Sequence, residues 1–138
     1  MPGRVGAAAA LVWQVFQRFE APEYPPQGVE AFRSFLEDRQ GLLSLGAWAA
    51  WEGEKLIGVL ASRREGSHIC LCFVREDWHR QGIGRSLWER FLAETCAKRI
   101  TVHSSPYAVG FYHRLGFLDT AEEQQQDGIR FTPMEYTR

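Results

Sequence analysis

Two glycines that flank a single residue, Gly82 and Gly84, follow a compact apolar run and open a stretch with helical periodicity. Apolar residues recur along one face of that stretch: Ile83, Leu87, Trp88, Phe91, Leu92 and Cys96. The first amides of a helix have no partner inside the helix, and glycine lets an anion approach them closely. The sequence therefore predicts a phosphate-sized anion site between a strand over 67–74 and this helix.

Cysteine is a second residue type in this region with chemistry of its own. Cys70 and Cys72 alternate along the predicted strand and so share a face, and Cys96 lies at the end of the predicted helix. No histidine stands with them at the spacing of a zinc site. We therefore expect three reduced, buried cysteines and no metal.

The 138 residues are predicted to form one domain, 1–138, whose core needs no disulfides. A formal net charge of −1 gives no long-range attraction to nucleic acid or to an anionic membrane. The apolar run at 7–12 ends at Trp13-Gln14, too early for a membrane span or an export signal. We expect a cytoplasmic protein without nucleic-acid or membrane partners.

Helices and strands that would position the glycine pair are predicted on both sides of it in the sequence. Periodicity predicts helices over 7–20 and 29–38, joined by a proline-rich elbow at residues 21–26. Three apolar runs separated by short polar turns are typical of an antiparallel meander: 45–51, 56–62 and 67–74.

Beyond the glycine helix, a strand at 100–103 is expected to pair in parallel with 67–74 through a crossover. A short helix over 107–115 then ends at Gly116. Two more strands, 117–119 and 129–136, are separated by a polar loop at 121–128, and Pro133 requires a bulge or an unpaired position. The predicted fold class is α/β (α+β), a mixed and mostly antiparallel central sheet flanked by helices.

This order of elements, with Gly82-x-Gly84 between strand and helix and Phe111-Tyr112-x-x-Leu115-Gly116-Phe117 downstream, resembles the GNAT superfamily of acyl-CoA-dependent N-acetyltransferases. The resemblance implies a sheet splayed at its parallel pair and acetyl-CoA as co-substrate. It also implies acetyl transfer to a primary amine of a small molecule or peptide, by direct attack in a ternary complex. A non-catalytic acyl-CoA-binding module is the alternative from a different class.

The resemblance assigns two segments to the acetyl-CoA site. The phosphate loop maps onto 79–84, with His79 in place of the family's Gln or Arg, so the expected contacts are His79, Arg80, Gln81, Gly82, Ile83, Gly84, Arg85 and Ser86. The backbone of Cys72, Phe73 and Val74 would pair with pantetheine, and the Val74 amide would polarise the thioester carbonyl. Ser105 stands where many members carry an Asn that contacts the cofactor, and it could equally cap the next helix.

By the same resemblance, Tyr112 lies near the cofactor sulfur and protonates the departing thiolate. A phenol with an ordinary pKa of about 10 is protonated at neutral pH and can act as the acid. The alternative is that Tyr112 is a core aromatic residue like its neighbours Phe111 and Phe117.

The general base is left open by the sequence. Glu20, Glu23 and His68 are candidates because the resemblance places them near the acceptor cleft. The elbow residues Glu20, Glu23 and Tyr24 are also the predicted substrate-binding residues.

The first element departs from the family pattern. Members usually begin with a strand, whereas only residues 1–6, rich in glycine and proline, precede the first predicted helix. We expect this strand to be missing or supplied by a partner chain, and the uncovered sheet edge to favour a homodimer.

Overall fold

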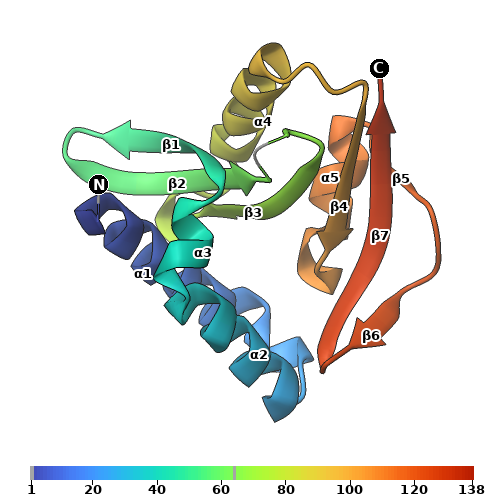
Figure 1. Cartoon of the computed structure of the whole chain (residues 1–138), viewed down its shortest axis with the longest axis horizontal. Helices are drawn as coiled ribbons and strands as arrows, with labels where there is room; N and C mark the ends of the chain where they lie inside the picture. Colours follow the sequence, from blue (N-terminus) through green and yellow to red (C-terminus); the bar gives the residue numbers. More distant parts are fainter. Residues whose placement is uncertain (1, 64) are drawn as a thin grey trace.

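The computed structural model describes residues 2–63 and 65–138, in which seven strands form a mixed sheet with helices on both faces (Figure 1). The strand bounds are β1 Gly46–Glu52, β2 Lys55–Ser62, β3 His68–Val74, β4 Arg99–Ser104, β5 Leu118–Asp119, β6 Gln124–Gln126 and β7 Ile129–Thr137. Their order is β1-β2-β3-β4-β7-β5, and β6 pairs with β7 outside this path. Among the strands of the described residues, only β3 and β4 pair in parallel, which confirms the predicted fold class.

The helices divide the core into two layers. Their bounds are α1 Pro2–Phe19, η1 Ala21–Glu23, α2 Pro26–Glu37, α3 Arg39–Leu43, η2 Glu76–Trp78, α4 Ile83–Glu94, η3 Pro106–Ala108 and α5 Val109–Leu115. Phe16 of α1 packs with Phe73 of β3 in one cluster, whereas Phe91 of α4 packs with Leu60 and Ile69 in the other. Side chains that alternate along β2 and β3 therefore pack into both layers of the core.

The parallel pair opens almost as soon as it forms. β3 and β4 are paired only at His68 with Thr101 and at Ile69 with Val102. The next residue of β3, Cys70, is an extra residue in the ladder with β2, because Ser62 pairs with Ile69 and Ala61 pairs with Leu71. A bulge bends the strand that carries it, and Figure 1 shows β3 diverging from β4. The splay implied by the family resemblance is therefore present.

The same bulge corrects the prediction for the cysteines. Cys70 packs with the α1 cluster and Cys72 with the α4 cluster, so the two do not share a face. Cys96 is exposed, because α4 ends at Glu94 and leaves it in the following loop. The three thiols are free, and the prediction that all three are buried is wrong, because Cys70 and Cys72 are half-buried and Cys96 is exposed.

The first helix is longer than predicted. α1 begins at Pro2 rather than at residue 7, so in the described chain no strand precedes it and β1 is a sheet edge. A glycine such as Gly6 costs a helix about 1 kcal/mol, and packing of Leu11, Val12 and Phe16 offsets this cost. The short helix α3 was not predicted at all.

The polar run at 121–128 is not only a loop. Its residues 124–126 form β6, which pairs with β7 through a two-residue turn at Asp127 and Gly128. Both turn residues have positive φ, 54° and 80°, the geometry of a type I′ hairpin turn.

Pro133 needs no bulge, because it pairs in regular register with His103. Its carbonyl accepts the Thr120 amide at 2.9 Å, so its backbone faces the β5 side, where a missing N–H costs the β4 ladder nothing.

Candidate active site

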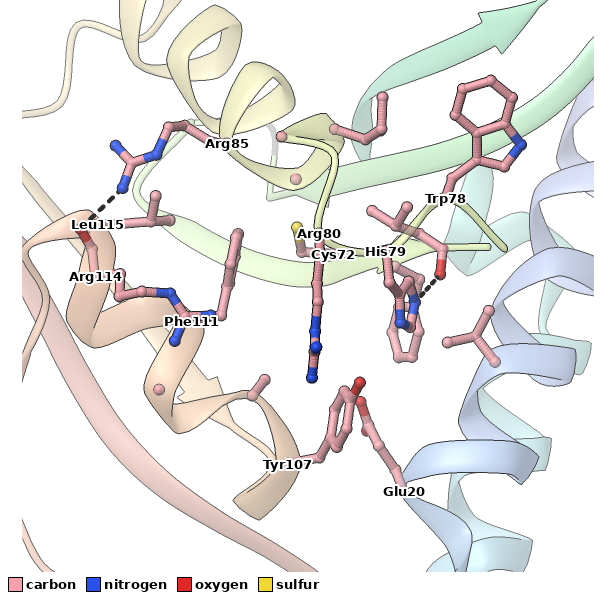
Figure 2. A pocket seen from close by; sticks show the side chains of 18 residues that line it. Glu20, Cys72, Trp78, His79, Arg80, Arg85, Tyr107, Phe111, Arg114 and Leu115 are labelled. Atoms are coloured by element: carbon pink, nitrogen blue, oxygen red, sulfur yellow. Dashed lines mark hydrogen bonds between the residues drawn. The ribbon is translucent and has the colours of Figure 1, made fainter. Parts of the chain in front are cut away.

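The splay opens into a groove of about 500 Å³ between β3, the loop before α4, α5 and the C-terminal end of α1 (Figure 2). Nine of the predicted cofactor residues line it: Cys72, Phe73, Val74, His79, Arg80, Gly82, Ile83, Gly84 and Arg85. Gln81, Ser86 and Ser105, which were also predicted, are not among its lining residues. The groove is thus bounded at one end by the glycine loop and at the other by Glu20.

Backbone groups of β3 face the groove at alternate residues. The Arg75 amide donates to the Ile57 carbonyl at 2.8 Å, and Gly58 is paired with Val74. This pattern makes Gly58–Val74 a non-hydrogen-bonded pair, so the N–H groups of Val74 and Cys72 point away from β2 toward the open side. The backbone N–H and C=O groups of Phe73 point toward β2, where Phe73 pairs with Val59. Phe73 is therefore the predicted pantetheine contact whose backbone groups are not free.

His79, the departure from the family motif, has a role in its side chain. Its Nε2 donates to the Val74 carbonyl at 2.6 Å, whereas its backbone amide donates to the Glu76 carbonyl at 3.2 Å. The His79 amide is therefore not free to make the cofactor contact predicted for this residue. The imidazole instead ties the loop to the end of β3 and leaves the Val74 N–H open.

The start of α4 has free backbone amides that could bind an anion. Gly82 is the N-cap with φ 81°, a left-handed conformation that favours glycine, and a Cβ atom there would meet nothing within 4 Å. The amides of Ile83, Gly84 and Arg85 precede the first intrahelical bond, which runs from Ser86 to the Gly82 carbonyl at 2.9 Å. Ser86 therefore has no free amide for the cofactor contact predicted for it.

Three arginines give the groove a positive charge. Arg80 and Arg85 were predicted, and Arg114 of α5 was not. Arg80 has φ 64°, unusual for a residue other than glycine, and its side chain extends along the groove toward Tyr107 (Figure 2). Arg85 donates to the Arg114 carbonyl at 3.0 Å and so links α4 to α5.

Tyr112 lies behind the groove wall, in the α4 cluster. Its ring is 5% exposed and contacts Phe111 and Phe117, with ring centroids 5.1 and 5.3 Å away. Burial raises the pKa of Tyr112 well above its usual range, and the charged forms of Cys72 and Glu20 add to the effect. The phenol is thus protonated at every physiological pH.

Glu20 closes the other end of the groove, directly after α1. Burial raises the pKa of its carboxyl to about 7, a hydrogen bond from Ser105 opposes this, and the charge of Glu23 reinforces it. Figure 2 shows Glu20 and Tyr107 pointing toward one another from opposite walls. Ser105 also caps η3, since its Oγ accepts the Ala108 amide at 3.3 Å.

The other acceptor-side candidates lie elsewhere. Glu23 is exposed and pairs with Arg130, and the Tyr24 hydroxyl donates to the Arg130 carbonyl at 3.2 Å. His68 is at the closed end of the splay, where its Nδ1 lies 2.8 Å from Thr101 Oγ1, and burial lowers its pKa to about 4. None of the three lines the groove.

A sequence profile described as "Acetyltransferase (GNAT) domain" matches residues 20–138. The chain belongs to the GNAT acetyltransferase family. This GNAT protein is therefore an acyltransferase that uses acetyl-CoA, with an amine as the class of acceptor.

Solved structures of the family share the fold. A GCN5-related N-acetyltransferase from Rhodopseudomonas palustris is 19% identical with a TM-score of 0.86, and the match covers 100% of this chain and 92% of that one. The PaiA N-acetyltransferase from Thermoplasma acidophilum, solved with coenzyme A, is 16% identical with a TM-score of 0.74 over 99% and 94%. An aminoglycoside 6′-N-acetyltransferase with coenzyme A is 13% identical with a TM-score of 0.63 over 94% and 89%. No curated protein matches the sequence significantly.

Two other kinds of feature are absent from residues 2–63 and 65–138. There, no cluster of three or more His, Cys, Asp or Glu side chains could hold a metal ion. Among the helices of the described chain, none is long and apolar enough to cross a membrane.

Proposed function

We propose that this GNAT enzyme acetylates a primary amine of a small molecule or peptide by direct attack in a ternary complex, with Glu20 as general base and Tyr112 as acid. The observation that carries the proposal is the Glu20 carboxyl, which lines the groove and has its pKa raised to about 7. A base whose pKa matches the working pH can take a proton and release it again.

The groove residues fit acetyl-CoA. The free amides at the start of α4, together with Arg80, Arg85 and Arg114, would bind its phosphates. The open N–H groups of Cys72 and Val74 would bind pantetheine, with the Val74 N–H on the thioester carbonyl. When bound, acetyl-CoA supplies an activated acetyl thioester.

Glu20 then takes the proton that the amine loses as its nitrogen bonds to the acetyl carbon. An ammonium has no lone pair, so the amine must attack in its neutral form. Tyr112 gives its hydroxyl proton to the sulfur as the carbon–sulfur bond breaks. Glu23 is a weaker candidate for the base, because Arg130 Nη1 lies 3.6 Å from its carboxylate.

An acceptor screen tests the proposal. The purified chain would be given acetyl-CoA with benzylamine, putrescine, an amino-acid amide or a tripeptide with a free N-terminus, and the released thiol measured. We expect at least one amine to raise thiol release well above hydrolysis. Calorimetric binding of acetyl-CoA with no release on any amine would contradict transfer and favour the non-catalytic binding module.

We also propose that residues 1–138 form one domain, that the protein is cytoplasmic and that it forms a homodimer. The sheet has two edges, β1 and β5, and on these strands Trp51 is 41% and Leu118 is 73% exposed. Such side chains on an open edge favour association. Sedimentation at micromolar concentration would show a dimer if the proposal holds and a monomer if it does not.

A further inference from the structure

The elbow that follows Glu20 is tied to a distant part of the chain by one side chain, Arg130 of β7. Its Nε and Nη2 donate to the two carboxylate oxygens of Glu123, at 2.9 and 3.2 Å. Its Nη1 donates to the Glu23 carbonyl at 3.0 Å and lies 3.6 Å from the Glu23 carboxylate. Arg130 therefore joins β7, the loop before β6 and the elbow.

Two further contacts join the elbow and the start of α2 to the β6–β7 hairpin. The Arg130 carbonyl accepts the Tyr24 hydroxyl at 3.2 Å. At the start of α2, the backbone of Gly28 lies so close to the turn of the β6–β7 hairpin that a Cβ atom on Gly28 would collide with the Gly128 carbonyl. The elbow is thus held at consecutive points along the hairpin.

The clamped residues are connected to Glu20 by one rigid turn. The Glu23 amide donates to the Glu20 carbonyl and the Tyr24 amide to the Ala21 carbonyl, both at 3.0 Å. A displacement of Glu23 would therefore move the Glu20 backbone with it.

We propose that Arg130 is a positioning residue that holds Glu20 in the groove by clamping the elbow to the β6–β7 hairpin. This inference rests on the proposed role of Glu20 as base. The ion pairs are partly exposed, with 33% of the Arg130 side chain accessible, so they stabilise the whole fold little. Their bidentate geometry and shared network instead fix the position of one segment.

Hydrogen exchange of the elbow amides tests the clamp. In Arg130→Met, exchange of the Glu23 and Tyr24 amides should be about tenfold faster than in the wild type. Arg99→Met is the matched control, because Arg99 also pairs with a carboxylate of β7, Glu135, at 2.8 Å and its loss changes the net charge equally. Unchanged elbow exchange in Arg130→Met, or equal acceleration in the control, would overturn the clamp.

Titration of the Glu20 carboxyl by carbon-13 NMR tests whether the clamp acts on Glu20. The titratable and charged groups that surround this carboxyl are Glu23, Tyr24, Tyr107, Cys72 and Tyr112, together with the Ser105 hydroxyl and with Arg80, which extends toward Tyr107. If the elbow is released, water reaches Glu20 and its pKa falls from about 7 to below about 6. If the elbow stays in place, the unneutralised charge of Glu23 raises this pKa instead, and a raised or unchanged value would overturn the proposal.

Neither readout needs an acceptor. A wild-type protein that acetylates no amine would contradict the proposed function without affecting the clamp, so the two failures are distinguishable. If Arg130→Met does not fold, Arg130→Lys has a single ammonium that cannot bond the Glu123 carboxylate in two places and the Glu23 carbonyl at once, so the same two measurements apply with the same expected directions.

Discussion

At the scale of the residue, the groove separates charges by function. Arg85 and Arg114 lie toward the end that suits phosphates, Arg80 extends along the groove toward Tyr107, and Glu20 is the acidic side chain at the other end of the described lining. Burial raises the pKa of two groups. It raises the pKa of the Glu20 carboxyl to about 7, so that the carboxyl can take a proton near neutral pH, and it raises the pKa of the Tyr112 phenol well above its usual range, which keeps the phenol protonated and makes it a weaker acid.

The role of Tyr112 can be tested by removing its hydroxyl. Tyr112→Phe should lower kcat by about 100-fold, the usual contribution of a general acid, while acetyl-CoA still binds. Tyr136→Phe is the matched control, since Tyr136 packs against the same cluster and should leave kcat unchanged. Equal kcat in the wild type and Tyr112→Phe would leave Tyr112 as a core aromatic only.

Several site residues could be predicted from local sequence, and several could not. The spacing of Gly82 and Gly84 was enough to predict the loop before α4. Arg130 contacts Glu23 from 107 positions away, and no local pattern reveals such a contact. The side-chain bond from His79 to Val74 spans five residues, but it depends on the turn between them.

At the scale of the element, the bulge at Cys70 and the loop before α4 together create the site. The bulge parts β3 from β4, and the left-handed Gly82 turns the chain so that the first amides of α4 face the opening. Predictable elements were those with a long apolar period. β6 has only the Asp127-Gly128 turn as a signal, and α3 only the Asp38 side chain, which accepts the Gly41 amide at 3.0 Å.

Gly82→Ala should test the loop as an element. A Cβ atom meets no neighbour there, so the cost is backbone strain of about 1–2 kcal/mol at φ 81°. We expect weaker acetyl-CoA binding by calorimetry together with this loss of unfolding free energy. Gly53→Ala, at φ 60° in a hairpin turn with equal open space, is the control. It should lose similar stability but bind normally, and equal binding by both variants would contradict the loop assignment.

At the scale of the whole molecule, Glu20 and His68 make opposite contributions to stability between about pH 4.5 and 6.5. The folded chain holds a proton on Glu20 that the unfolded chain releases, so this group lowers the unfolding free energy as pH rises. Burial lowers the pKa of His68 to about 4, so the unfolded chain binds the extra proton there and stability rises with pH. The two effects largely cancel in the wild type.

In Glu20→Gln, the effect of His68 on the pH dependence of stability should therefore no longer be cancelled. Relative to the wild type, its unfolding free energy should increase by on the order of 2 kcal/mol between pH 4.5 and 6.5. His68→Asn should show the opposite trend. Urea denaturation at several pH values measures both, and a difference from the wild type that stays constant with pH would contradict the assigned shifts.

The most direct test of the account is the pH dependence of kcat/KM for acetyl transfer, in the wild type and in Glu20→Gln, with the best amine of the acceptor screen. The account predicts that wild-type activity rises with pH through about 7, as Glu20 loses its proton. Glu20→Gln should lose about 100-fold or more of the activity and this rising limb with it. A Glu20→Gln variant with the wild-type rate and the same limb would contradict the central claim.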